Sequence, residues 1–117
     1  MPLIRIDHNS TIINEELEQK LVAELLQFAM TLHNMNEDQI SIFTQKYSPS
    51  SHSTAAAEVE VRAKKLEYGD DPESRRQNHM EEYEKFFRTF LESNSIEKGV
   101  VFTLTLEDWS VKFVSQS

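Results

Sequence analysis

The chain has 117 residues, a net charge of −8 and no cysteine, and 38% of its residues are hydrophobic. This length and composition suit one folded domain, and the lack of cysteine excludes disulfides, thiol catalysis and cysteine-bound zinc. The acidic balance and the scattered basic residues argue against nucleic-acid binding. No apolar stretch is long enough to cross a membrane and the first residues lack a signal-peptide pattern, so we expect a cytoplasmic protein.

The first half of the chain predicts a strand, a helix and a second strand. Residues 2–7 alternate, with Ile4 and Ile6 on one face, and residues 8–11 form a turn cluster. Asn14 is a suitable N-cap for a helix that should end near residues 33–34. Its apolar stripe consists of Leu17, Leu21, Leu25, Phe28, Ala29 and Leu32. Residues 40–47 then predict the second strand.

The second half predicts the same order after a polar loop at residues 48–54. Residues 57–64 alternate most regularly, with Val59, Val61 and Ala63 on one face and Glu58, Glu60, Arg62 and Lys64 on the other. Asp71 and Pro72 predict a helix start, and this helix should end near residues 94–95. Its apolar stripe is Met80, Tyr83, Phe87, Phe90 and Leu91. Residues 99–106 predict a fourth strand, and residues 109–114 a short fifth.

The whole pattern predicts a single α+β domain over residues 1–117, made of duplicated β-α-β units at about 2–47 and 57–106. We expect a four-stranded mixed sheet with two helices on one face, plus a short C-terminal strand. Two helices can cover only one face of such a sheet. The charged face of residues 57–64 must therefore meet water or another subunit, which points to an oligomer.

Most kinds of chemistry find no support in the sequence. His8, His33, His52 and His79 are not paired at metal-ligand spacing, so we expect surface histidines and no metal. Two glycines cannot form a phosphate-binding loop, and the serine-rich segment 48–54 lacks the glycine-flanked turn of a nucleophilic serine. The carboxylates lie mostly on the solvated faces of the predicted helices.

Pro2 remains as a candidate. Once Met1 is removed, Pro2 carries a free α-amine with a pKa of roughly 7.7–8.0, which burial would lower. A neutral amine held at the start of an ordered strand could take a proton from a carbon next to a carbonyl. The other interpretation is that a small second residue simply permits removal of Met1. Pro2 alone does not decide between them.

Pro2 running directly into a strand, the duplicated strand-helix-strand order and the length together resemble the tautomerase superfamily. Its members include macrophage migration inhibitory factor and the bacterial oxalocrotonate tautomerases, and this chain is most similar to the longer, two-repeat members. The resemblance implies a homotrimer whose sheets form a barrel, with active sites at subunit interfaces. It also implies that Pro2 is the general base of a cofactor-independent keto–enol tautomerase or isomerase acting on a small carbonyl compound.

The resemblance suggests further site residues and also has gaps. Phe102, Trp109 and Phe113 match the aromatic residues that a neighbouring subunit contributes in the family, although core packing would explain them equally. The arginines that hold a dicarboxylate in oxalocrotonate tautomerases have no counterpart in residues 8–11 or 40–42. Arg5, Lys46 or Arg62 could replace them. Two other functions stay open: a non-catalytic trimeric binding or assembly domain of the same fold, and a ferredoxin-like module that binds a small ligand or partner.

Overall fold

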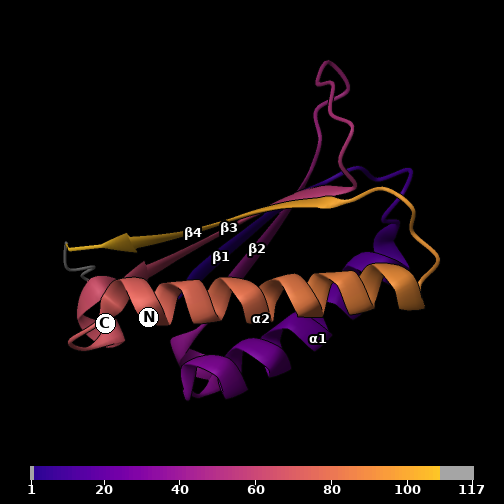
Figure 1. Ribbon diagram of the computed structural model, residues 1–117. Coiled ribbons are helices and arrows are strands. Elements are labelled where there is room, and N and C mark those ends of the chain that lie inside the picture. Colours follow the sequence, from indigo (N-terminus) through magenta and orange to yellow (C-terminus); the bar gives the residue numbers. More distant parts are fainter. Residues whose placement is uncertain (1, 109–117) are drawn as a thin grey trace, which may run out of the picture.

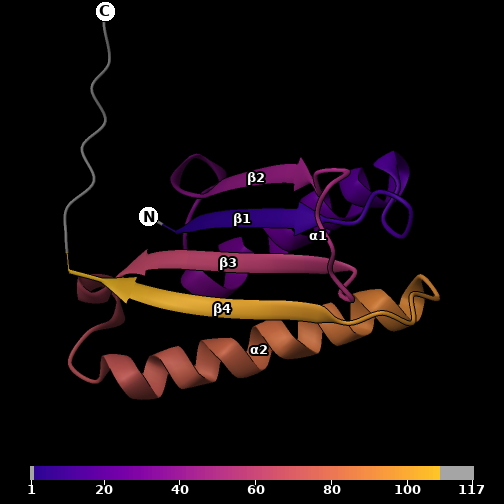
Figure 2. The same cartoon turned by 90° about the horizontal axis from the view of Figure 1, so that it is seen from above.

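The computed structural model describes residues 2–108, and its described strands form one mixed sheet in the order β2-β1-β3-β4. These strands are β1 (Leu3–His8), β2 (Ser41–Lys46), β3 (Ala57–Lys64) and β4 (Val100–Glu107). β1 is parallel to β2, β3 is parallel to β4, and the two pairs meet through the antiparallel contact of β1 with β3 (Figure 2). Each half of the chain therefore forms one β-α-β unit, as predicted.

Both long helices, α1 (Glu15–His33) and α2 (Pro72–Ser93), lie on the same face of the sheet (Figure 1). Each begins at the predicted cap, because the Asn14 side chain accepts a hydrogen bond from the Leu17 backbone and Asp71 accepts one from Ser74. The sequence did not predict the short 3₁₀ helices η1 (Glu37–Gln39) and η2 (Lys65–Tyr68).

The core fills the space between the sheet and the two helices. From the sheet it takes the inward positions of the two central strands and Leu104 of β4, and from the helices one stripe each. Its fully enclosed members include Ile4, Ile6, Val61, Leu25, Ala29, Tyr83 and Leu104. The predicted α+β class with two helices on one face is confirmed. The predicted fifth strand, at residues 109–114, lies outside the described residues.

Within residues 2–108 no helix covers the other face of the sheet, and the side chains of that face alternate along each strand with the buried ones. Glu58, Glu60 and Arg62 of β3 are exposed there, as the strict alternation of this strand predicted. Two apolar side chains are exposed with them: Phe43 is 60% and Val101 54% exposed. The segment between β2 and β3 projects from this side (Figure 1). We call this surface the open face.

None of the described helices is long and apolar enough to span a membrane.

The expectation of surface histidines is wrong for two of the four residues. His8 is the last residue of β1 rather than part of a turn, and its side chain is only 1% exposed. It continues the inward row of Ile4 and Ile6, because side chains two residues apart share a face of a strand. His79 of α2 is 9% exposed, and His33 at the end of α1 is half-buried. His52, in the projecting segment, is exposed as expected.

Candidate functional site

Pro2 lies at the start of β1 in an ordered and enclosed position. Its side chain is less than 2% exposed. Its carbonyl oxygen accepts a hydrogen bond of 3.2 Å from the backbone nitrogen of Ser41, the first residue of β2. Pro2 also belongs to the inward row of Ile4 and Ile6, on the side of the helices. The residue is therefore held by the sheet and is not part of a loose tail.

The ends of β3 and β4 lie at the same end of the sheet as Pro2. Leu3 pairs with Arg62 of β3, and Arg62 pairs with Thr105 of β4. The guanidinium of Arg62 contacts the Glu107 carboxylate through Nη2 at 2.6 Å and Nε at 2.8 Å. Next to these strand ends is a pocket of about 620 Å³, lined by Lys64, Lys65, Leu66, Gly69, Asp70, Pro72, Glu107 and Asp108. Arg62 is thus near Pro2 but already bound to a carboxylate.

Arg5 and Lys46 are brought together, but away from Pro2. Both line a pocket of about 380 Å³ at the other end of β1 and β2, where Glu58 of β3 also lies. The Arg5 guanidinium donates a 3.3 Å hydrogen bond to the Gln45 side chain. Neither Arg5 nor Lys46 lines the pocket at the Pro2 end of the sheet.

Phe102 packs inside the chain rather than on the open face. Its ring stacks on Tyr83 with the centroids 4.9 Å apart and lies 5.7 Å from the ring of Phe87. Phe102 therefore lies between the sheet and α2, partly buried against the core. The other two aromatic candidates, Trp109 and Phe113, lie outside the described residues.

The sequence analysis missed a cluster of four polar rings, which we call the His–Tyr cluster: His33, Tyr68, His79 and Tyr83. They come from the ends of α1 and η2 and from one face of α2. His33 Nε2 lies 2.7 Å from the Tyr83 hydroxyl, and His79 Nδ1 lies 2.8 Å from the Tyr68 hydroxyl. The two imidazoles meet edge to face at 4.8 Å. The spacing of His79 and Tyr83, four residues apart on a helix, was the available sequence signal.

Burial keeps all four groups of the cluster uncharged near pH 7. It lowers the pKa of His33 to about 4, with a further contribution from nearby His79. The pKa of His79 is lowered by burial and by the positive charge of Arg75. The pKa values of the Tyr68 and Tyr83 hydroxyls are raised, again chiefly by burial. The cluster therefore presents neutral imidazoles and protonated phenols.

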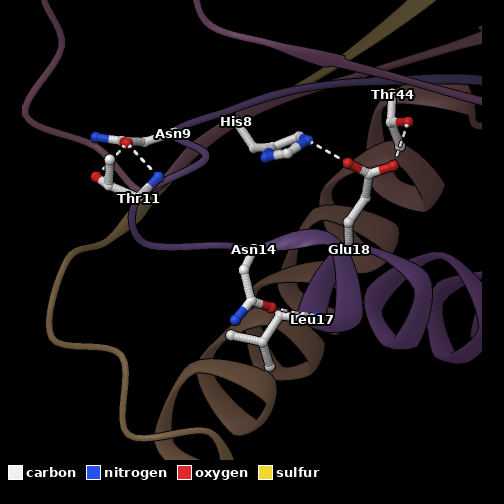
Figure 3. A network of polar contacts seen from close by, with 7 residues as sticks. All are labelled: His8, Asn9, Thr11, Asn14, Leu17, Glu18 and Thr44. Carbon is white, nitrogen blue, oxygen red and sulfur yellow. Dashed lines mark hydrogen bonds and ion pairs between the residues drawn. The ribbon is translucent and has the colours of Figure 1, made fainter.

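A second polar network lies at the opposite end of β1 (Figure 3). His8 Nε2 lies 2.7 Å from one oxygen of the Glu18 carboxylate, and the other oxygen accepts a 3.0 Å hydrogen bond from the Thr44 hydroxyl. Glu18 thus joins the first turn of α1 to both β1 and β2. Among residues 2–108, no group of three or more histidine, aspartate or glutamate side chains is arranged to hold a metal ion.

Comparisons with known proteins agree with this fold. No family model and no curated protein matches the sequence. Solved structures do match. 5-Carboxymethyl-2-hydroxymuconate delta-isomerase superposes with a TM-score of 0.72 at 12% identity, covering 97% of this chain and 89% of its own.

Two further matches are similar. A probable enzyme from the fungus Aspergillus fumigatus has a TM-score of 0.72 at 12% identity, over 95% of this chain and 80% of its own. A macrophage migration inhibitory factor-like protein from Entamoeba histolytica has a TM-score of 0.59 at 14% identity, over 95% of both chains. At these identities the likeness concerns the fold, and it confirms the tautomerase-type fold expected from the sequence.

Proposed function

We propose that the protein is a cofactor-independent tautomerase or isomerase in which the amine of Pro2, freed by removal of Met1, is the general base. The substrate would be a small carbonyl compound with an acidic C–H bond next to the carbonyl. The observation that carries the proposal is the position of Pro2, enclosed and bonded to Ser41 at the start of β1. Enclosure favours the uncharged amine, which is the form that can accept a proton.

The comparisons support the reaction class only through the fold. One neighbour is named as a delta-isomerase. For this chain, that activity is part of the proposal. The proline ring adds a fixed direction for the nitrogen lone pair, because it restricts rotation about its own backbone bond.

We further propose that copies of the chain associate through the open face, as a homotrimer. Exposed Phe43 and Val101 lie in that face among charged side chains, and association would cover them. A neighbouring copy could then supply what one chain lacks near Pro2. Arg5 and Lys46 could bind an acidic substrate in this way, and Trp109 and Phe113 could complete its apolar wall. Arg62 would serve only if the substrate displaced Glu107.

The second candidate function is a non-catalytic assembly or binding domain of the same fold. The observation that favours it is the engagement of Arg62 with Glu107, which leaves no unpaired guanidinium beside Pro2 in the described chain. The ferredoxin-like alternative gains no support, since the neighbours named above with this fold include a delta-isomerase and a macrophage migration inhibitory factor-like protein.

A panel of α-keto acids tests the proposal. Purified protein is first checked by intact mass for the loss of Met1, and enol formation is then followed by ultraviolet absorbance. We expect turnover by the processed protein and a loss of about 100-fold or more in Pro2→Ala, since a positioned base contributes about 10²–10⁴. Turnover that is equal in both proteins would remove Pro2 from the mechanism. No turnover by processed protein on any substrate would favour the non-catalytic candidate.

A further inference from the structure

The His33–Tyr83 pair lies at the Pro2 end of the molecule. α1 begins beyond the end of β1 and runs back over the sheet, so its last residue, His33, returns to the level where β1 starts (Figure 2). A short connection then leads to Ser41, whose backbone nitrogen donates a hydrogen bond to the Pro2 carbonyl oxygen. His33 and Pro2 thus share one end and one side of the sheet, the side of the helices.

The hydrogen bond to Tyr83 determines which nitrogen of His33 carries the proton. The Tyr83 side chain is fully buried, and its hydroxyl has no acceptor among the described residues other than His33 Nε2. A buried hydroxyl proton needs an acceptor, so the Tyr83 O–H donates to Nε2. A neutral imidazole with an unprotonated Nε2 carries its hydrogen on Nδ1. The ring therefore presents an N–H group at Nδ1.

That N–H group is available to a ligand. Within residues 2–108 the His33 ring makes no hydrogen bond other than the one to Tyr83. Its Nδ1 atom is not fully buried. Since the side chain is half-buried, this nitrogen reaches solvent at the edge of the cluster. The Tyr83 ring stacks on Phe102, and this contact holds the hydroxyl that binds His33 in place. The result is a rigid neutral donor at the Pro2 end of the sheet.

We propose that His33 is a second catalytic residue of the site, donating a hydrogen bond from Nδ1 to the substrate oxygen while Pro2 moves the proton. This inference rests on the proposed function of Pro2. The C–H bond breaks, its electron pair forms the C=C bond, and the carbonyl π pair moves onto oxygen. The proton goes to the Pro2 nitrogen and returns to the oxygen, or to another carbon in an isomerisation. His33 keeps its own proton throughout.

A neutral imidazole suits this role because it can donate without protonating the enolate outright. The burial that holds the pKa of His33 near 4 keeps the ring in this form at neutral pH. A fixed donor aimed at a developing oxyanion typically contributes a factor of about 10²–10³ in rate. Tyr83 is then a positioning residue, because it acts only by fixing the ring and its tautomer.

The experiment compares protein lacking Met1 with its His33→Phe, Tyr83→Phe and Pro2→Ala variants, with phenylpyruvate as the substrate. Gln19→Phe is the control, since Gln19 is exposed near the start of α1, at the opposite end of that helix from His33. We expect kcat to fall about 100-fold in His33→Phe and to be unchanged in the control. In Tyr83→Phe, kcat should fall less, with a visible change of His33 tautomer in ¹⁵N-detected spectra.

The outcomes separate the two proposals. If Pro2→Ala is inactive while His33→Phe keeps wild-type kcat, the role of His33 is overturned and that of Pro2 stands. Spectra of the wild-type protein provide a readout without turnover: the tautomer should carry its proton on Nδ1, and phenylpyruvate should shift that resonance. A proton on Nε2, or no shift at saturating phenylpyruvate, overturns the role of His33 even if every variant folds poorly. A shift without turnover overturns only the proposed reaction.

Discussion

A histidine lies at each end of α1, and the two have different partners. His8, at the first turns of α1, contacts the Glu18 carboxylate, whereas His33, at the last turn, is bonded to the Tyr83 phenol. The contacts of Glu18 join β1, α1 and β2, which all belong to the first repeat. The hydrogen bond between His33 and Tyr83 joins the first repeat to the second, because Tyr83 belongs to α2. The comparison shows that, on the helix side of the sheet, the end near His8 is closed by a charged partner and the end near Pro2 carries neutral rings.

Acidification should have the largest effect on stability, and it should act mainly at the end of α1 that carries His33. His33 has a pKa of about 4 in the folded chain and about 6.5 when unfolded, so the unfolded state binds the proton first. The stability that this difference provides is complete above pH 6.5 and is lost as the pH falls to 4, by up to about 3 kcal/mol. Burial shifts the pKa of His79 in the same direction.

Urea unfolding at pH 7 and pH 4 checks this expectation. The His33→Gln variant should lose less stability between the two pH values than the wild-type protein does. Amides near the end of α1 should also lose protection from hydrogen exchange before those near Glu18. An identical pH dependence in the variant and the wild-type protein would contradict the role assigned to burial of His33.

Removing the carboxylate at the other end should have the next largest effect. Glu18→Ala leaves the His8 ring, which is 1% exposed, without its partner, and it also frees the Thr44 hydroxyl. We expect a loss of about 2 kcal/mol in the free energy of unfolding at pH 7, measured by urea titration. Thr44→Val is the control, since it removes one hydrogen bond and leaves the His8 contact. A larger loss of stability in Thr44→Val than in Glu18→Ala would mean that the contact with His8 is not the main contribution of Glu18.

The smallest effect is expected from Tyr83→Phe. The substitution keeps the ring that stacks on Phe102 and removes only the hydroxyl bonded to His33. We expect a loss of about 1 kcal/mol at pH 7, because one buried hydrogen bond is deleted and the imidazole can turn toward water. Thermal unfolding detects a change of this size. A loss as large as that of Glu18→Ala would mean that the two ends are energetically equal.

Local patterns in the sequence were sufficient to predict most of the fold. The alternation of β3 gave its bounds and its buried face, and Asn14 and Asp71 marked both helix starts. These features depend on residues within a few positions of one another. η2 escaped prediction, because a single turn of four residues after a strand has no periodicity to detect.

The candidate site was only partly predictable. Pro2 and its ordered strand were found, since both are local features. His33 was assigned to the surface because its partner, Tyr83, is fifty residues away in the chain. Arg5 and Lys46 were grouped with Pro2 by charge alone. The register of the sheet places Lys46 beside His8, at the other end of β1, and Arg5 in the middle of that strand, and both line a pocket away from Pro2. Such pairings depend on tertiary contacts that spacing along one chain does not encode.

The antiparallel contact of β1 with β3 has a consequence for protein synthesis. Leu3 pairs with Arg62, and a ribosome that adds 5–20 residues per second reaches Arg62 roughly 3–12 s after Leu3. During that interval β1 lacks the central neighbour that helps to enclose Pro2. In the folded chain the enclosure of Pro2 therefore depends on both repeats and is complete only after the second repeat has been synthesised.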